Sequence, residues 1–214
     1  VTGKESCKAK KIYLGYLPFD INEFYSGDEL RGWVLPRGWD VEEAIINYHG
    51  SLLHDCLKKN PLGCAYLSPS FKGKVNKNEL LAHCCWRDDL PKATVYDWTR
   101  LYRTGKKSWG LCIPWEKLKD FPSEDLDISI KTSNYDSKML VYDYLLEGDY
   151  KEEIIINAHN CHPYQANDDI SGCAVAIAVF QYLKKLKNRR YSYRLIISPE
   201  LFGPMFWLEK NKNC

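Results

Sequence analysis

The most constraining feature of this 214-residue sequence is an apolar segment, a helix-length segment and a second apolar segment between residues 153 and 198. Glu153–Ala158 and Tyr191–Ser198 are almost continuous apolar runs of strand length, and Ser171–Leu186 lies between them. The first half of the middle segment is apolar on nearly all sides. Strand, helix and strand in this order predict a βαβ unit with two buried parallel strands and a right-handed crossover.

The ends of the predicted helix fit this assignment. Ser171 is a good N-cap residue, because its hydroxyl can accept a hydrogen bond from a free backbone N–H of the first turn, and Gly172 permits close backbone approach. Positive charge at the other end, on Lys184, Lys185 and Lys187, complements the helix dipole. We therefore expect the helix to begin at Ser171.

The first 150 residues differ, because short apolar stretches alternate there with Gly and Pro. This pattern is typical of short strands joined by turns. Candidate strands cover residues 11–17, 32–35, 43–48, 63–67, 108–113, 127–132 and 138–147, and one helix is predicted at Lys77–His83. Six of the seven tryptophans lie in this part, where such residues most often form the core of a small domain.

Charge and hydropathy exclude two classes of partner. The sequence has 30 Lys and Arg against 28 Asp and Glu, a net charge of +2, which disfavours binding to nucleic acid or to an acidic membrane surface. The longest strongly apolar run, Gly172–Phe180, is far shorter than the roughly 20 residues that a membrane span needs. We expect a globular protein with neither nucleic acid nor membrane as a partner.

The nine cysteines show no regular spacing and no C-x-x-C pair, which disfavours a structural zinc ribbon. Cys112 and Cys173 lie inside apolar runs, where a free thiol behaves as a small hydrophobic group. This usage predicts a reducing compartment and cytoplasmic localisation.

Polar side chains cluster where the two predicted parallel strands end. Carboxyl ends of parallel strands form the usual ligand-binding edge of an α/β sheet. The residues expected to meet there are His162 or His159, Asp168 or Asp169, and Glu200. Imidazole with carboxylates suits a catalytic zinc ion, and also manganese or cobalt.

Two other interpretations apply to this cluster. The Asn-Asp-Asp run could simply cap the helix, although this leaves the histidines and Glu200 unexplained. Cys161 could act as a nucleophile, for which His159 but not His162 would be in reach, because alternate side chains of an extended strand point to opposite faces. A small filler beneath the sheet edge is the favoured role for this thiol.

Short motifs along nearly the whole chain carry a family resemblance. They are Ser26-Gly27, Trp33, Pro36, Trp39-Asp40-Val41, Trp109-Gly110-Leu111-Cys112, Gly148, Cys161-His162-Pro163, Ala166-Asn167-Asp168, Ser171-Gly172, Arg190-Tyr191-Ser192-Tyr193-Arg194 and Pro199-Glu200. In this order they resemble bacterial aminopeptidase-like zinc peptidases with an inserted β-rich domain of unknown function, distant relatives of di-zinc aminopeptidases and glutaminyl cyclase.

The resemblance implies an α/β fold with a partial zinc-exopeptidase-like, mostly parallel sheet. Residues 1–26 would form a leading strand and linker, residues 27–134 the inserted β-rich domain, and residues 135–214 an incomplete aminopeptidase-like domain. The implied activity is that of a zinc-dependent hydrolase, in which metal-activated water attacks the carbonyl of a peptide or aminoacyl substrate.

The resemblance also implies roles for individual residues toward one or two zinc ions. His162 would be a metal ligand and Asp168 the carboxylate that bridges two metals, with Asp169 following across a cis peptide bond. Glu200 occupies the place of a pair of glutamates, a general base followed by a metal ligand. Because Pro199 takes one position of that pair, Glu200 is either ligand or catalytic base, and we favour the ligand.

A complete site of this kind needs another carboxylate and another histidine from later strands, whereas residues 201–214 offer only Glu209. We therefore expect a fragment or a partial copy that is inactive by itself. The alternative is a catalytically inactive binding module that keeps the fold and uses the insertion to recognise a protein or a glycan.

Overall fold

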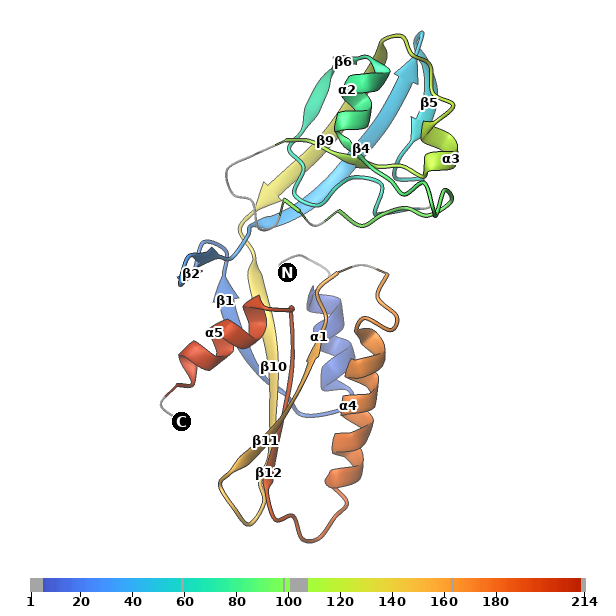
Figure 1. Cartoon of the computed structure of the whole chain (residues 1–214). Helices are drawn as coiled ribbons and strands as arrows, with labels where there is room; N and C mark the ends of the chain where they lie inside the picture. The colour runs from blue at the N-terminus through green and yellow to red at the C-terminus, as the bar shows by residue number, and fades with distance from the viewer. Residues whose placement is uncertain (1–5, 59, 98, 101–107, 163, 213–214) are drawn as a thin grey trace. The chain divides into compact units, whose positions relative to one another are not determined.

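The structure, a computed structural model, describes residues 6–58, 60–97, 99–100, 108–162 and 164–212. The chain divides into two compact units (Figure 1). Unit 1 comprises Val1–Gly38 and Tyr135–Cys214, and unit 2 comprises Trp39–Asn134. Residues 27–38, which the sequence analysis assigns to the insertion, therefore belong to unit 1.

Unit 1 contains a four-stranded sheet of order β1-β10-β12-β11. Its strands are β1 (Asp20–Tyr25), β10 (Lys138–Leu146), β12 (Ser192–Ser198) and β11 (Glu153–His159). The pairs β1·β10 and β10·β12 are antiparallel, so the expected mostly parallel sheet is wrong. The segments that flank unit 2 pair with each other like the arms of a hairpin, and this pairing runs antiparallel.

The predicted βαβ unit is confirmed in its order and strand direction, but the expected burial of its first strand is wrong, because β11 stands at the edge of the described sheet and exposes Ile154 and Ile155. Strands β11 and β12 are parallel neighbours, and helix α4 (Ile170–Leu183) lies between them in the chain. The helix begins one residue earlier than predicted, and its N-cap residue is Asp169 instead of Ser171. The Ser171 hydroxyl donates backward to the carbonyl of Asn167 at 3.0 Å, so it does not cap the helix.

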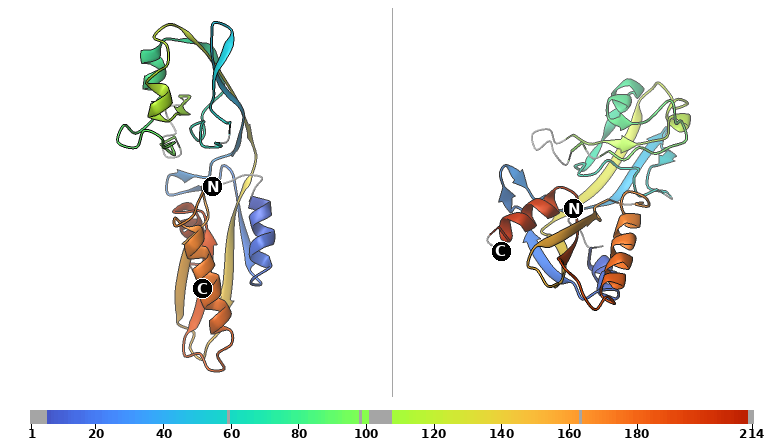
Figure 2. Two further views of the ribbon diagram at one scale, coloured as in Figure 1. Left: turned by 90° about the vertical axis from the view of Figure 1, so that its right-hand side faces the viewer. Right: turned by 60° about the horizontal axis from the view of Figure 1, so that its bottom comes forward.

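Helices cover both faces of this sheet (Figures 1 and 2). Helices α1 (Ser6–Leu14) and α4 lie on one face and line an open pocket of about 590 Å³. Helix α5 (Phe202–Lys210) lies on the other face, where Trp207 donates to Asp143 of β10. The expected strand over residues 11–17 is wrong, because residues 11–14 belong to α1, in which Tyr13 is buried, and Leu17 is buried in the turn that follows.

Unit 2 has its own four-stranded sheet, of order β5-β4-β9-β6. Its elements are β4 (Gly38–Tyr48), β5 (Ser51–Asp55), β6 (Phe71–Val75), β9 (Leu126–Tyr135), α2 (Lys77–Ala82), α3 (Trp115–Leu118) and the short pair β7 (Cys84–Cys85) and β8 (Leu111–Cys112). The predicted helix at Lys77–His83 is confirmed. The expected strand over residues 63–67 is reduced to an isolated bridge between Cys64 and Leu111.

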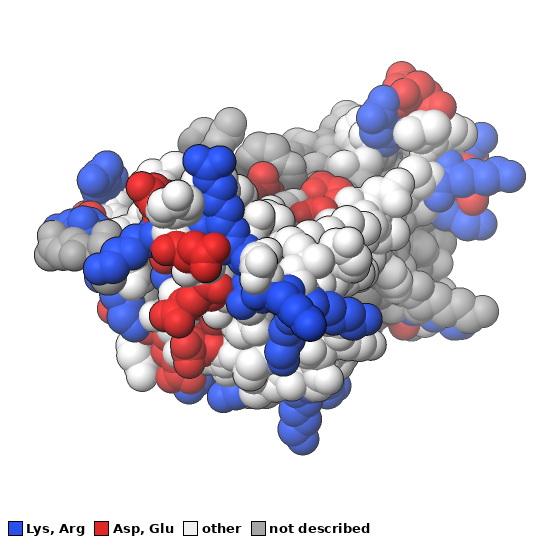
Figure 3. Space-filling view, turned by 90° about the horizontal axis from the view of Figure 1, so that it is seen from below, with Lys and Arg blue, Asp and Glu red and all other residues white. Residues whose placement is uncertain are grey.

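Strands β2 (Glu29–Leu30) and β3 (Trp33–Val34) form a short antiparallel pair in unit 1. Among the described residues, no helix is both long enough and apolar enough to cross a membrane. On the face seen in Figure 3, acidic and basic side chains are interspersed.

Candidate metal centre

The candidate site lies at the carboxyl ends of the two parallel strands. His159, the last residue of β11, is the register partner of Ser198, the last residue of β12. The backbone N–H of Asn160 donates to the carbonyl of Ser198 at 3.0 Å and holds the two strand ends together. The segment that carries the histidines and the segment that carries Glu200 therefore leave the sheet side by side, as the βαβ prediction requires.

Three possible metal ligands gather directly after β11. One donor atom each from His159, Cys161 and His162 lies within 4.8 Å of the others, and all three side chains are half-buried. Cys161 Sγ is 3.5 Å from Nδ1 of His159 and 3.4 Å from Nδ1 of His162. The expectation that Cys161 and His162 point apart is wrong, because β11 ends at His159 and strand alternation does not continue into the loop.

The other ring nitrogen of His159 faces the acidic pair. Its Nε2 is 2.7 Å from Oδ1 of Asp168, whose side chain is 79% exposed. The backbone N–H of His159 donates to Oδ2 of Asp169 at 3.0 Å. The peptide bond between the two aspartates is cis, as the family resemblance implies.

Gly172 makes this arrangement of the acidic pair possible. A Cβ atom at that position would lie 2.0 Å from Oδ1 of Asp169, closer than atoms can approach. The predicted close approach at Gly172 is thus made by the Asp169 side chain. Asp169 holds the backbone at the end of β11, which leaves Asp168 as the carboxylate that contacts the imidazole.

Gln165 is a member of the cluster that sequence reasoning missed. Its Nε2 lies 3.5 Å from Nδ1 of His159 and 3.3 Å from Nδ1 of His162. The only feature of the sequence that could have indicated Gln165 is its position in the same loop, three residues after His162. The amide and the Cys161 thiol together fix the orientation of both rings.

Glu200 lies close enough to act on the Cys161 thiol. Burial raises the pKa of Cys161, and the negative charges of Glu200 and Asp168 raise it further, while the backbone N–H of Glu200 has the opposite effect. The thiol is therefore protonated at neutral pH, which weighs against a nucleophilic role. The Glu200 side chain is exposed.

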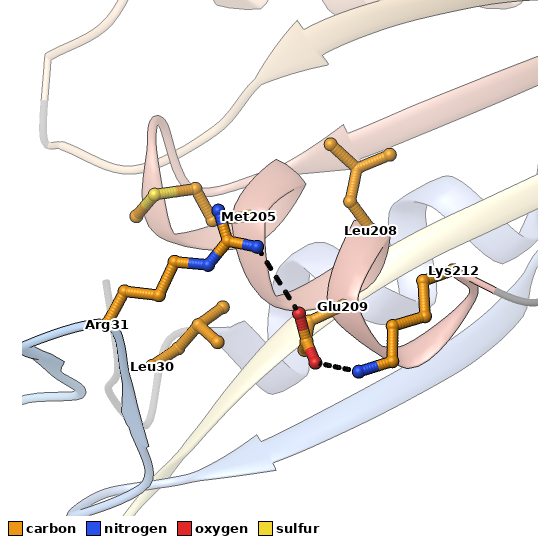
Figure 4. Close-up of a pocket in the computed structure, with 6 residues that line it drawn as sticks. All are labelled: Leu30, Arg31, Met205, Leu208, Glu209 and Lys212. Carbon is orange, nitrogen blue, oxygen red and sulfur yellow. Dashed lines mark hydrogen bonds and ion pairs between the residues drawn. The ribbon is translucent and has the colours of Figure 1, made fainter.

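Glu209, the other carboxylate late in the chain, is engaged in ion pairs on α5. It lies 3.8 Å from Arg31 Nη2 and 2.5 Å from Lys212 Nζ (Figure 4). These residues line a separate cavity of about 360 Å³ with Leu30, Met205 and Leu208. The hydrogen bond from Lys212, with its charge, lowers the pKa of Glu209. Glu209 thus has partners of its own at this cavity.

Sequence comparison decides the family. The family model described as a domain of unknown function, DUF4910, matches residues 1–214. The chain belongs to this family. It is also 28% identical, over its full length, to a Clostridium acetobutylicum protein named "Putative polysaccharide biosynthesis protein with aminopeptidase-like domain". The chain covers 48% of that protein, so this DUF4910 chain spans about half the length of the relative.

Comparison with solved structures also finds peptidases among the similar proteins. A crystal structure titled as a putative peptidase from Clostridium acetobutylicum matches with a TM-score of 0.79 and 27% identity, over 100% of this chain and 49% of that one. A zinc aminopeptidase from Bacillus subtilis matches with a TM-score of 0.58 and 12% identity, over 96% of this chain and 58% of that one. This DUF4910 chain shares the fold of a zinc aminopeptidase over part of that protein's length.

Proposed function

We propose that this DUF4910 domain belongs to a zinc-dependent, aminopeptidase-like hydrolase that acts on a peptide or aminoacyl substrate. The observation that carries the proposal is the contact between His159 and Asp168, beside His162, at the ends of two parallel strands. The shared fold with zinc aminopeptidases supports it. Because the chain spans half of its relative, hydrolysis is proposed for the whole protein and metal binding for this domain.

The donor set fits zinc. Imidazole nitrogen, thiolate sulfur and carboxylate oxygen are the three kinds of ligand that zinc takes from proteins. Bonds of about 2.0–2.2 Å place the nitrogen and oxygen ligands of a tetrahedral ion about 3.3–3.5 Å apart, so Nε2 of His159 and Oδ1 of Asp168, which are 2.7 Å apart, would separate slightly to bind one ion. The exposed side chains of Asp168 and Glu200 leave carboxylate oxygens available for the ion.

The protein residues divide into ligands and supports. We assign His162, Asp168 and Glu200 to the metal and add His159 through its Nε2 atom. Cys161 and Gln165 lie beside the Nδ1 atoms, and Asp169 fixes the backbone of His159. Because an imidazole that binds zinc through Nε2 carries its proton on Nδ1, the Gln165 side chain would then present its amide oxygen as the acceptor. Zinc bound here would polarise a substrate carbonyl and lower the pKa of a bound water to about 7.

Glu200 is assigned to the metal because its neighbour on the N-terminal side is Pro199, which supplies neither a ligand nor a base. The substitution Glu200→Gln separates the two roles. Loss of metal affinity is the result expected for a ligand. Retention of metal, with loss of hydrolysis in the full-length protein, would instead make Glu200 the general base.

The experiment is metal analysis of the purified chain. We expect stoichiometric zinc by mass spectrometry, and a cobalt-substituted protein with the visible absorption of a low-symmetry site. Asp168→Ala should lower zinc affinity at least about 10-fold, whereas Asp149→Ala, an exposed control in unit 1, should leave it unchanged.

A chain that binds no zinc under these conditions, and whose cobalt spectrum is that of the free ion, would contradict the proposal. It would favour the second candidate, a catalytically inactive binding module on the same fold. A thiolate-to-cobalt charge-transfer band would place Cys161 among the ligands and revise its supporting role.

A further inference from the structure

Unit 2 contains five cysteines, of which two face each other across a pair of strands. Strands β7 and β8 are parallel, and Cys85 is the register partner of Cys112. Partner residues on adjacent strands lie about 5 Å apart and share one face of the ladder. This spacing falls inside the range of about 4.4–6.8 Å between Cα atoms that a disulfide bond accepts.

Asp97 contacts both thiols of this pair. The Cys85 thiol donates to Oδ2 of Asp97 at 3.3 Å, and the backbone N–H of Asp97 donates to the Cys112 sulfur. The two thiols are also hydrogen-bonded to each other. The hydrogen bond with Cys85 and burial raise the pKa of Cys112 well above its ordinary value in spite of the Asp97 N–H, so Cys85 is the sulfur of the pair that reacts first as a thiolate.

The surroundings hold Asp97 in place. It is 5% exposed and forms an ion pair with Arg100, and the Thr99 hydroxyl donates to its Oδ1 at 2.7 Å. Arg100 also donates to the backbone carbonyls of Ser108 and Trp109. Gly110 leaves room for the guanidinium, because a Cβ atom there would lie 2.2 Å from Arg100 Nη2.

The two thiols differ in access. Cys85 is half-buried, whereas Cys112 is 2% exposed. The hydrogen bond with Cys112 lowers the pKa of Cys85, and the charge of Arg100 acts in the same direction against burial and Asp97. Burial raises the pKa of Cys64 to about 11 and that of Cys84 to about 12. A reagent directed at thiolates therefore selects Cys85 over these neighbours.

We propose that Cys85 and Cys112 form a reactive dithiol that a low-molecular-weight disulfide oxidises to an intrachain disulfide. The Cys85 thiolate attacks one sulfur of the reagent, its proton having passed to solvent, and displaces one reagent thiolate. Cys112 gives its proton to the thiolate released in the first step, and its sulfur attacks Cys85 Sγ in the mixed disulfide. This displaces the second reagent thiolate, which takes up from solvent the proton that Cys85 lost. The chain loses two electrons, and the reagent disulfide is reduced to two thiols.

The Cys85–Cys112 pair belongs to unit 2, whereas the candidate metal centre belongs to unit 1. To test the proposal, the reduced full chain is incubated with oxidised glutathione, quenched with N-ethylmaleimide and digested without reductant. We expect a cross-linked peptide that joins Cys85 to Cys112 and a mass loss of two hydrogen atoms from the intact chain. Cys56, Cys64 and Cys84 should carry maleimide once the chain is unfolded in the quench.

Three variants sharpen the test. Cys112→Ser should accumulate glutathione on Cys85, because the resolving thiol is gone, and Cys85→Ser should form neither product. Cys84→Ser is the matched control, adjacent in sequence with a side chain on the other face of the ladder, and should still form the cross-link.

Equal labelling of Cys84 and Cys85 with no Cys85–Cys112 peptide would overturn the proposal, as would a disulfide that joins Cys84 to Cys85. If Cys112→Ser fails to fold, the rate of maleimide labelling in the wild-type chain decides. Cys85 must then react at least several-fold faster than any other cysteine of unit 2.

Discussion

The two units use the same residue types in opposite ways. In unit 2, Asp97 is 5% exposed and is surrounded by Arg100, Thr99 and Cys85. In unit 1, Asp168 has a side chain that is 79% exposed and contacts the ring of His159. The first carboxylate is committed to its own fold, whereas the second keeps oxygen lone pairs available at the edge of a sheet.

The difference in exposure between these two carboxylates helps to separate polar clusters that stabilise the fold from those that can bind a ligand. A charge removed from water must be paired within the protein, and a paired charge stabilises the surrounding loops. A cluster at strand ends, where Cys161 and Gln165 orient imidazoles that face an exposed carboxylate, has donor capacity left for an ion. Substitutions in the two clusters should therefore affect different measurements.

The largest expected effect is on the stability of unit 2. Arg100→Leu would leave Asp97 as a buried charge without its partner, which typically costs about 3–5 kcal/mol. Urea denaturation should show this loss as a lower transition midpoint for unit 2. The control is Arg87→Leu, which breaks the exposed pair with Asp89 and should leave the midpoint unchanged. Equal midpoints for both variants would show that the Asp97 cluster is not structural.

The second prediction compares one histidine from each unit. His159→Ala should lower zinc affinity at least about 10-fold, with little effect on the unfolding midpoint. His83 in unit 2 stacks on Trp109 with ring centres 3.9 Å apart and contacts its carbonyl at 3.0 Å. His83→Ala should therefore destabilise the chain by about 1–2 kcal/mol and leave zinc affinity unchanged. A loss of zinc binding in both variants would remove the distinction between the clusters.

The order of the βαβ unit can be read from the sequence because both of its strands are apolar runs, although only β12 is buried and β11 exposes Ile154 and Ile155. Leu195, Ile196 and Ile197 of β12 are all buried, so the apolar run is visible without knowledge of the fold. The direction of a strand is not visible in its sequence pattern, so the antiparallel pairing of β10 could not be predicted. The strand predicted over residues 11–17 is wrong because the apolar residues of so short a stretch fit both a strand and a helix period, and packing against the sheet favours a helix that buries Tyr13.

The sequence indicates where in the fold the candidate site lies, but not which of its side chains contact one another. Strand ends bring the His159 segment and Glu200 together, and this follows from the order of the elements. The choice between His159 and His162 as the partner of Asp168 depends on the backbone after β11, which no periodic pattern encodes. Gln165 belongs to the cluster for the same reason.

The third prediction concerns acid, and its effect is smaller. Burial would raise the pKa of Asp97, but hydrogen bonds from Thr99 and Cys85 and the charge of Arg100 outweigh it and hold the pKa below its ordinary value. A carboxyl group of this kind stabilises the fold above its unfolded pKa of about 3.9, and the contribution is lost as pH falls through the folded pKa. Asp97→Asn should therefore lose stability at neutral pH and show a flatter stability curve below about pH 4. Unfolding midpoints at several pH values measure this, with the exposed Asp125→Asn as control, and parallel curves for wild type and Asp97→Asn would contradict it.

The smallest expected effect distinguishes the starts of two helices. Asn76 caps α2, since its side chain accepts a hydrogen bond from the N–H of Glu79 at 3.0 Å, so Asn76→Ala should cost about 1 kcal/mol. Ser171 lies inside α4 and donates to a carbonyl at an exposed position, so Ser171→Ala should change stability by less than about 0.5 kcal/mol. Neither variant should change zinc affinity, because the start of α4 is positioned by Asp169 and Gly172. A cost for Ser171→Ala as large as that for Asn76→Ala would mean that the serine caps the helix in solution, and that the backbone around Asp168 differs from the one on which the metal centre rests.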